Sequence, residues 1–244
     1  MNKYNGIIIS LIAGASTLIG FFSIYIKGSK EKIISRSLSF AGGVMIMLSI
    51  IDLIPSSILN LKHSNNYFIA IIYSLIFIIM GFIMSYFIQN IVHEKESLSK
   101  TGVISMIGIM LHNIPEGIAT YMLSNINLKL GIVLSIAIIM HNIPEGVGIS
   151  IPIYYGTGDK KKAFIYTLVS GLSEPLGAII SMIFLYKYID VSTMGIIYAI
   201  IAGLMIYIGY FELIRTSKKY ENYVNTFTLL GALFILIVEI ILKL

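Results

Sequence analysis

Apolar residues in this chain gather into eight long runs separated by short polar segments. A helix needs roughly 20 mostly apolar residues to cross the hydrocarbon layer of a bilayer, and each run is close to that length. The runs are 6–26, 38–59, 67–91, 102–124, 130–154, 163–186, 192–213 and 226–244. The pattern predicts an all-α integral membrane protein with eight transmembrane helices.

The composition agrees with this interpretation. Charged residues make up 12% of the chain, whereas soluble domains carry about 25%. Little sequence remains outside the runs, so residues 1–244 are interpreted as a single transmembrane domain. The chain has no cysteine, which excludes disulfides and thiolate ligands, so any bound metal must be held by nitrogen and oxygen atoms.

The net charge of +5 is distributed unevenly. If eight helices alternate in direction, the loops after the first, third, fifth and seventh share one face. That face and its flanks hold Lys27, Lys30, Lys32, Arg36, Lys95, Lys100, Lys160, Lys161, Lys162, Arg215, Lys218 and Lys219. The opposite face holds Lys3, Lys62, Lys129, Lys187 and Lys243. This bias predicts a cell-membrane protein with both termini outside the cytoplasm. It explains the basic charge without a nucleic-acid partner.

The second and seventh runs resemble each other. Residues 43–57, GVMIMLSIIDLIPSS, align with residues 203–217, GLMIYIGYFELIRTS, and place Asp52 opposite Glu212. The same offset sets the first run on the sixth and the third on the eighth. The two helices of each pair are separated by an odd number of membrane crossings, so they run in opposite directions through the membrane. This predicts an inverted repeat, with helices 1–3 related to 6–8, as in many secondary transporters.

A hexapeptide, HNIPEG, occurs twice, at 112–117 in the fourth run and at 141–146 in the fifth. Positions i and i+4 share one face of a helix. Two facing antiparallel helices would therefore bring His112, Glu116, His141 and Glu145 together, a set that suits zinc, iron or manganese. Asn113 and Asn142 are rotated by about 100° and could reach a second ion, with one or both glutamates bridging.

Each hexapeptide also contains a proline. Pro115 and Pro144 lack an N–H and crowd the preceding turn, so each leaves a carbonyl without its helical partner. Irregular backbone at membrane depth is tolerated where protein or a water-filled cavity surrounds it. The pattern therefore indicates two bent helices that line a cavity. The simpler alternative is that each histidine is an ordinary interhelical hydrogen-bond partner.

Four further acids lie within the apolar runs, of which Glu239, five residues from the C-terminus, is interpreted as interfacial. Glu174, in SGLSEPLGA at 170–178, lies near the middle of the sixth run, where an ionised carboxylate is costly unless it is paired or hydrated. Its simpler interpretation is a protonated side chain bonded to nearby backbone. Asp52 and Glu212 lie towards the ends of their runs and are either solvated interfacial residues or part of an ion path.

On these motifs, the chain resembles the ZIP (Zrt/Irt-like) family of divalent metal transporters, and within it the bacterial ZupT-type zinc uptake permeases. The resemblance covers essentially the whole chain. It implies a single transporter domain in a 3+2+3 arrangement of helices, with the fourth helix related to the fifth. It also implies import of zinc, ferrous iron and other divalent ions through a binuclear site between those two helices.

The resemblance assigns ligands as well. His112, Glu116, His141 and Glu145 would bind one ion, and Asn113, Glu116, Asn142, Glu145 and Glu174 would bind the other. Zn²⁺ and Fe²⁺ are then transported ions, and no cofactor is expected. Some relatives carry a histidine beside the seventh-helix acid; Phe211 takes that place here, which puts an accessory site there in doubt. A homodimer is compatible with the sequence, which does not specify an oligomeric state.

Two other functions fit parts of the pattern. A membrane di-metal carboxylate enzyme would also need clustered histidines and carboxylates. However, the spacing is His-x-x-x-Glu, and no additional glutamate beside a histidine stands free to act as a general base for hydrolysis. A passive channel would differ in rate and saturation and not in any particular residue. We expect a transporter, whose uptake should weaken as pH falls because metal ligands must be deprotonated.

Overall fold

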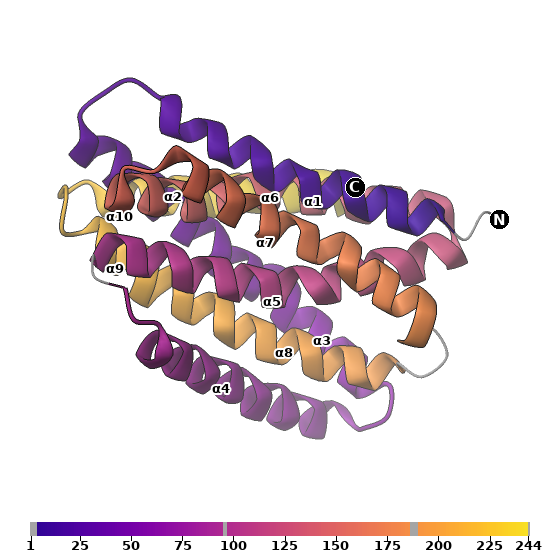
Figure 1. Cartoon of the computed structure of the whole chain (residues 1–244). Coiled ribbons are helices and arrows are strands. Elements are labelled where there is room, and N and C mark those ends of the chain that lie inside the picture. The colour runs from indigo at the N-terminus through magenta and orange to yellow at the C-terminus, as the bar shows by residue number, and fades with distance from the viewer. Residues whose placement is uncertain (1–3, 95–96, 186–189, 244) are drawn as a thin grey trace.

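The computed structural model describes residues 4–94, 97–185 and 190–243. Lys3, Lys95 and Lys187, which contribute to the charge bias, lie outside these ranges. The described part is an all-helical bundle (Figure 1). Eight of its helices are long and apolar enough to cross a membrane: Asn5–Tyr25, Lys30–Lys62, Tyr67–Ile91, Ser97–Ile126, Leu128–Thr157, Lys160–Phe184, Val191–Ser217 and Val224–Leu242. The prediction of eight transmembrane helices is therefore confirmed.

The spans are built from individual helical elements. The α-helices are α1 (Asn5–Phe21), α2 (Lys30–Leu48), α3 (Ile54–Lys62), α4 (Tyr67–Ile91), α5 (Ser97–Ile126), α6 (Leu128–Thr157), α7 (Lys160–Ile180), α8 (Val191–Tyr207), α9 (Arg215–Ser217) and α10 (Val224–Lys243). A 3₁₀ segment, η1 (Phe22–Tyr25), ends the first span. Three π-helical segments, η2 (Ser49–Leu53), η3 (Ser181–Leu185) and η4 (Ile208–Ile214), lie within or end other spans.

Several helices begin before the apolar runs that predicted them. The second starts at Lys30 instead of 38, and the fourth at Ser97 instead of 102. Hydropathy detects only the part of a helix that suits hydrocarbon, whereas polar turns continue beyond it. Asparagine or aspartate side chains cap other starts: the carboxylate of Asp159 accepts hydrogen bonds from the backbone N–H groups of Lys161 and Lys162, at 2.8 and 3.0 Å.

The two acids that the repeat placed opposite each other both lie in π-helical turns. Asp52 lies in η2 and Glu212 lies in η4. A π-turn carries one extra residue, is rare, and is found frequently at functional sites. Hydrophobic periodicity does not reveal such a turn, so the sequence predicted the acids but not the local widening of their helices.

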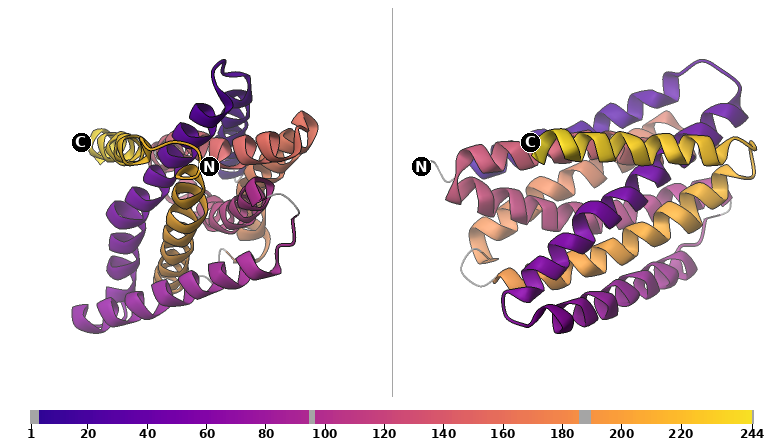
Figure 2. Two further views of the ribbon diagram at one scale, coloured as in Figure 1. Left: turned by 90° about the vertical axis from the view of Figure 1, so that its left-hand side faces the viewer. Right: turned by 180° about the vertical axis from the view of Figure 1, so that it is seen from behind.

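The helices form two groups. In one, α1, α5, α6 and α7 pack against one another; in the other, α2 packs on α10 and α8 packs on α4. Figure 2 shows α4 and α10 at the outside of the bundle. Their side chains are accordingly the least buried: 22% of the most apolar window of α4 and 28% of that of α10, against 44–61% in the other spans. The two hexapeptides lie in the first group, where α5 packs against α6.

Contacts between these helices occur in matched pairs. Gly117 of α5 abuts the backbone oxygen of Glu174, and Gly146 of α6 abuts that of Thr17. In both cases a Cβ atom would clash, so glycine permits the close approach. Gly177 against Ile114 is likewise matched by Gly20 against Ile143. Throughout, the matched positions differ by 29 residues between α5 and α6 and by 157 between α1 and α7. The second and seventh runs align at an offset of 160, so the prediction that the same offset relates the first and sixth runs is wrong by three residues. An inverted repeat would produce such pairs, although the 3+2+3 arrangement itself stays a prediction.

Candidate metal site

The two hexapeptides face each other where α5 and α6 pack together. Nε2 of His141 lies 2.9 Å from Oε1 of Glu116, and Nε2 of His112 lies 3.2 Å from the same oxygen. Nε2 of His112 is also 3.6 Å from Oε1 of Glu145. Pro115 and Pro144 lie inside helices that continue through them. The structure therefore brings together all four side chains that the sequence placed on facing surfaces.

These spacings suit a transition-metal ion. Ligand atoms around a tetrahedral zinc lie about 3.4 Å apart when each is roughly 2.1 Å from the ion. Single ligand atoms of His112, His141 and Glu145 all lie within 4.8 Å of one another, and Glu116 contacts both imidazoles. Small rearrangements of the side chains would enclose one ion between two nitrogen and two oxygen ligands.

A second polar group lies next to these four residues. Nδ2 of Asn142 donates to Oε2 of Glu174 at 3.0 Å and to the backbone oxygen of Ala13 at 3.0 Å. Nδ2 of Asn113 donates to the backbone oxygen of Ser170 at 3.2 Å. Asn113, Asn142 and Glu174 are all fully buried. The backbone of α1 and α7 therefore fixes the orientation of both amides.

This orientation leaves buried oxygen atoms without protein partners. Among the described residues, Oδ1 of Asn113, Oδ1 of Asn142, Oε1 of Glu174 and both carboxylate oxygens of Glu145 have no hydrogen-bond partner. Buried polar atoms are nearly always satisfied, so each exception needs an explanation. Unpaired carboxylate and amide oxygens, with the amide nitrogens engaged elsewhere, match the ligand requirements of a divalent cation.

A cavity of about 750 Å³ leads from this cluster to one end of the bundle. Glu116 lies at its inner limit and Asp52 lies on its wall. His63 and Asp190 line it near the α3–α4 connection and the start of α8. The side chain of Glu116 is 12% exposed, whereas that of Glu145 is 1% exposed. The cluster is therefore approached from the side of Glu116.

Glu212, the other acid considered for an ion path, does not line this cavity. It is buried between α5 and η4, where the hydroxyl of Thr101 lies 3.4 Å from its Oε2 and 3.0 Å from the hydroxyl of Thr216. Thr101 and Glu212 lie towards the opposite ends of their helices from the cavity mouth. The structure thus places Asp52 and Glu212 on different sides of the central cluster.

Sequence reasoning missed the residues that support the cluster. The backbone oxygens of Ala13 and Ser170 hold the two amides, and Tyr198 and Met194 line the cavity. The contacts to Ala13 and Tyr198 join spans that are distant along the chain, and these residue types are common in apolar helices. No local signal identifies them.

Comparisons with known proteins agree with the site. The model of the family described as "ZIP Zinc transporter" matches residues 92–239, which include both hexapeptides and Glu174. The chain is 36% identical to the zinc transporter ZupT of Campylobacter jejuni, over 88% of each protein. It is 35% identical to that of Oceanobacillus iheyensis, over 99% of this chain and 98% of the relative. It is 32% identical to that of Clostridium perfringens, over 99% and 96%. This chain therefore belongs to the ZIP family of zinc transporters.

Proposed function

We propose that this chain imports zinc, together with ferrous iron and other divalent transition-metal ions, across the cell membrane into the cytoplasm. The observation that carries the proposal is the convergence of two histidines and two glutamates from α5 and α6 at the inner limit of a cavity. Zinc is favoured because relatives that match nearly the whole chain are named zinc transporters. Residues 1–244 would act as a single transporter domain.

The site would be binuclear. His112, Glu116, His141 and Glu145 supply the nitrogen and oxygen ligands that zinc accepts. Asn113 and Asn142 offer only oxygen because their amide nitrogens are engaged, and Glu174 offers carboxylate oxygen. Together with shared oxygens of Glu116 and Glu145, they would suit a harder ion or a second ion in passage. Ligand type decides selectivity more than affinity order does, so the two positions should differ in the metal that they prefer.

The large cavity would deliver the ion. Its mouth lies at the end of the bundle opposite most of the lysines and arginines. Because basic residues favour the cytoplasmic side, the mouth would face away from the cytoplasm. An ion would pass Asp52 before it reaches Glu116. Because Glu212, Thr101 and Thr216 fill the far side, release to the cytoplasm requires a rearrangement. Movement of one part of an inverted repeat against the other provides alternating access in many transporters.

Uptake into sealed liposomes by the purified protein tests this proposal. His141→Ala removes a nitrogen ligand and should reduce zinc uptake more than iron uptake. Asn113→Ala removes an oxygen and should reduce iron uptake more. His93→Ala is the matched control and should transport normally, because His93 is a loop histidine whose Nδ1 lies 2.6 Å from the backbone oxygen of Ile91. Equal loss of every metal in both site variants would contradict the two-position assignment.

The same liposomes address pH and the enzyme alternative. Protons compete with metal for histidine and carboxylate ligands, so initial uptake should weaken between neutral and mildly acidic external pH. Unchanged uptake would count against the ligand set. A di-metal enzyme would instead convert a substrate without any net metal flux, so metal accumulation inside the vesicles distinguishes the two functions.

A further inference from the structure

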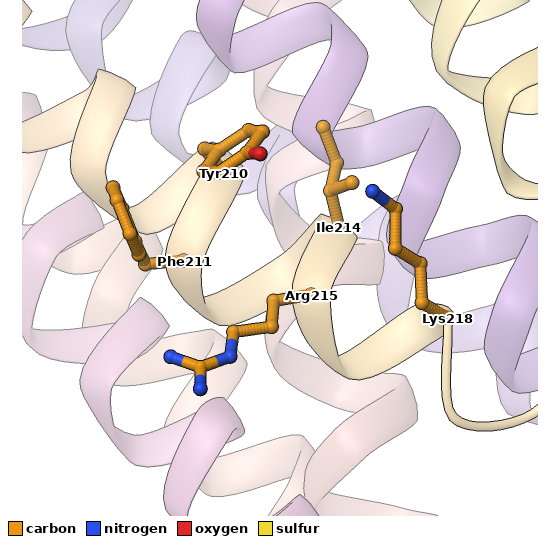
Figure 3. Close-up of a pocket in the computed structure, with 5 residues that line it drawn as sticks. All are labelled: Tyr210, Phe211, Ile214, Arg215 and Lys218. Carbon is orange, nitrogen blue, oxygen red and sulfur yellow. The ribbon is translucent and has the colours of Figure 1, made fainter.

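A second pocket lies at the other end of the seventh span, far along the helix from the cavity mouth. It has a volume of about 230 Å³ and is lined by Tyr210, Phe211, Ile214, Arg215 and Lys218 (Figure 3). All five residues belong to η4, α9 and the residue that follows. The apolar span ends at Ser217, so the pocket lies where hydrocarbon would give way to lipid headgroups.

Two cations of this pocket form no contact ion pair with the acids that the structure describes. Arg215 and Lys218 are exposed, and neither forms an ion pair within the described residues. Of the acids nearby in sequence, Glu212 is buried against Thr101. Glu221 is engaged by Arg36, whose guanidinium donates two hydrogen bonds of 3.1 Å and lowers the pKa of that carboxyl. Within the described residues, Glu212 acts on Arg215 only at longer range, and no carboxylate is in salt-bridge contact with either cation.

Aromatic rings form the wall on the membrane side. Phe211 stacks on Tyr207, with ring centroids 5.0 Å apart, and meets Phe82 of α4 edge to face at 5.7 Å. The hydroxyl of Tyr207 donates to the amide oxygen of Gln89, which fixes this group further. Tyr210 is 48% exposed, and its ring centroid lies 5.9 Å from Nζ of Lys218. Amphipathic aromatic rings are typical of the headgroup level.

The side chains spread around one face of the helix. Figure 3 shows Arg215 extending to one side of the ribbon, beneath Phe211, and Lys218 extending to the other side, beside Ile214 and Tyr210. Because both exposed side chains line one pocket, turning them towards each other would bring both charges to a single anionic group. That group would have rings and an aliphatic side chain next to it, towards the middle of the span. Both a charge and an apolar chain are therefore accommodated, as a phospholipid requires and a free anion does not.

We propose that this pocket binds the headgroup of one anionic phospholipid. The guanidinium of Arg215 would donate paired hydrogen bonds to phosphate oxygens, and Lys218 would neutralise the remaining charge. The first carbons of the acyl chains would pack on Tyr210, Phe211 and Ile214. Basic residues just beyond a transmembrane helix are attracted to anionic headgroups by about 1 kcal/mol each. The site is separate from the metal cluster and does not depend on the proposed transport.

Native mass spectrometry of the delipidated full chain in detergent tests the site. The probes are phosphatidylglycerol and phosphatidylcholine with identical acyl chains. The wild type should bind the first phosphatidylglycerol more tightly than phosphatidylcholine. Arg215→Gln with Lys218→Gln should weaken that step by at least about tenfold, as the loss of two interfacial cations predicts. Arg215→Lys with Lys218→Arg should retain most of the binding, because charge is preserved.

The matched control is Lys160→Gln with Lys161→Gln, which removes two charges from the start of α7 outside the pocket. It should change phosphatidylglycerol binding less than twofold. An equal loss in this control would overturn the proposal in favour of general charge attraction. Equal binding of phosphatidylcholine would overturn it as well. Displacement of the lipid by millimolar inorganic phosphate would show a simple anion site and would equally refute it.

Discussion

The α5 and α6 sides of the metal cluster have nearly the same backbone surroundings but different side chains. The amide of Asn113 donates to the backbone of α7, and that of Asn142 donates to the backbone of α1 at the matching position. Yet Glu174 stands next to Asn142, whereas the matching residue, 157 positions away, is Thr17. The hydroxyl of Thr17 is buried without a partner in the described part of the chain. The backbone contacts on the two sides of the cluster therefore match, whereas the candidate ligand side chains do not.

The two glutamates differ in the same sense. Glu116 contacts both histidines and borders the cavity, whereas Glu145 is sealed and contacts His112 alone. A repeated backbone can thus place ligands on both sides of an ion without making the two sides equivalent. Unequal sides give an ion a direction of approach and a second position that differs from the first. We infer that the repeated backbone positions ligands on both sides of the ion. The side chains that differ between the two sides would then determine the direction of ion approach and the metal preference.

The largest expected effect comes from Glu116. Glu116→Gln should reduce zinc uptake into liposomes by more than about 100-fold, because a metal ligand is lost and the loss of a supporting contact alone costs 10–100-fold. Glu145→Gln should have a smaller effect on initial zinc uptake, since Glu145 lies within 4 Å of only one histidine. Both substitutions keep the size of the side chain.

Zinc binding to the purified variants, measured by calorimetry, separates ligand loss from misfolding. Monodisperse protein with weakened binding supports a ligand role. A Glu145→Gln variant that is more damaged than Glu116→Gln would reverse the assignment of the two sides. An equal loss of zinc uptake in the two variants would contradict the inference that Glu116 and Glu145 have unequal roles.

The next effect concerns Glu174 and Thr17. Glu174→Thr should lower uptake about 10–100-fold, the range for a residue that supports or completes a metal site. Adding Thr17→Glu should recover part of that loss, because the new carboxylate would lie beside Asn113. The backbone beside the two positions is matched, since Gly171 lies next to Thr17 as Gly14 lies next to Glu174.

Thr17→Glu alone is the control for this exchange. It adds a carboxylate without removing one and should shift the preferred metal more than the rate. Uptake of zinc and iron should be measured for all three variants at equal amounts of folded protein. If the double variant transports no better than Glu174→Thr, the two sides are not interchangeable at this position.

Much of this architecture could be predicted from sequence. The eight spans follow from apolar runs, because burial in hydrocarbon leaves a strong signal over roughly 20 residues. The meeting of His112, Glu116, His141 and Glu145 follows from helical spacing in two copies of one motif. Both signals lie within short stretches of sequence. One reflects the fixed thickness of the hydrocarbon layer and the other the fixed geometry of the α-helix.

The rest depends on contacts that local patterns do not encode. The π-turns around Asp52 and Glu212 interrupt no hydrophobic pattern. Thr17 is an ordinary residue in an apolar helix, and only the packing of α1 on α6 shows that it matches Glu174. The sequence also left Asp52 and Glu212 equivalent, whereas their surroundings differ: Asp52 lines the cavity and Glu212 is buried against Thr101.

The smallest expected effect tests whether the backbone contacts on the α5 and α6 sides of the cluster are equivalent. Gly117→Ala and Gly146→Ala each add a Cβ that would meet the backbone oxygen of Glu174 or of Thr17. Overpacking of this kind costs about 1–3 kcal/mol. Thermal unfolding in detergent should therefore show two similar decreases in Tm. Gly148→Ala in the same α6 helix is the control.

The control has a clear physical basis. The nearest atom to a Cβ at Gly148 is a Leu213 side-chain carbon at 3.4 Å, and alanine favours a helix by up to about 1 kcal/mol over glycine. Gly148→Ala should thus be neutral or stabilising. Since Gly117 and Gly146 face matched backbone atoms, unequal costs at these two positions could not come from the ligands. Such a result would show that the helix packing itself differs between the α5 and α6 sides. It would contradict the inference that the two sides share one backbone arrangement and differ only in their ligand side chains.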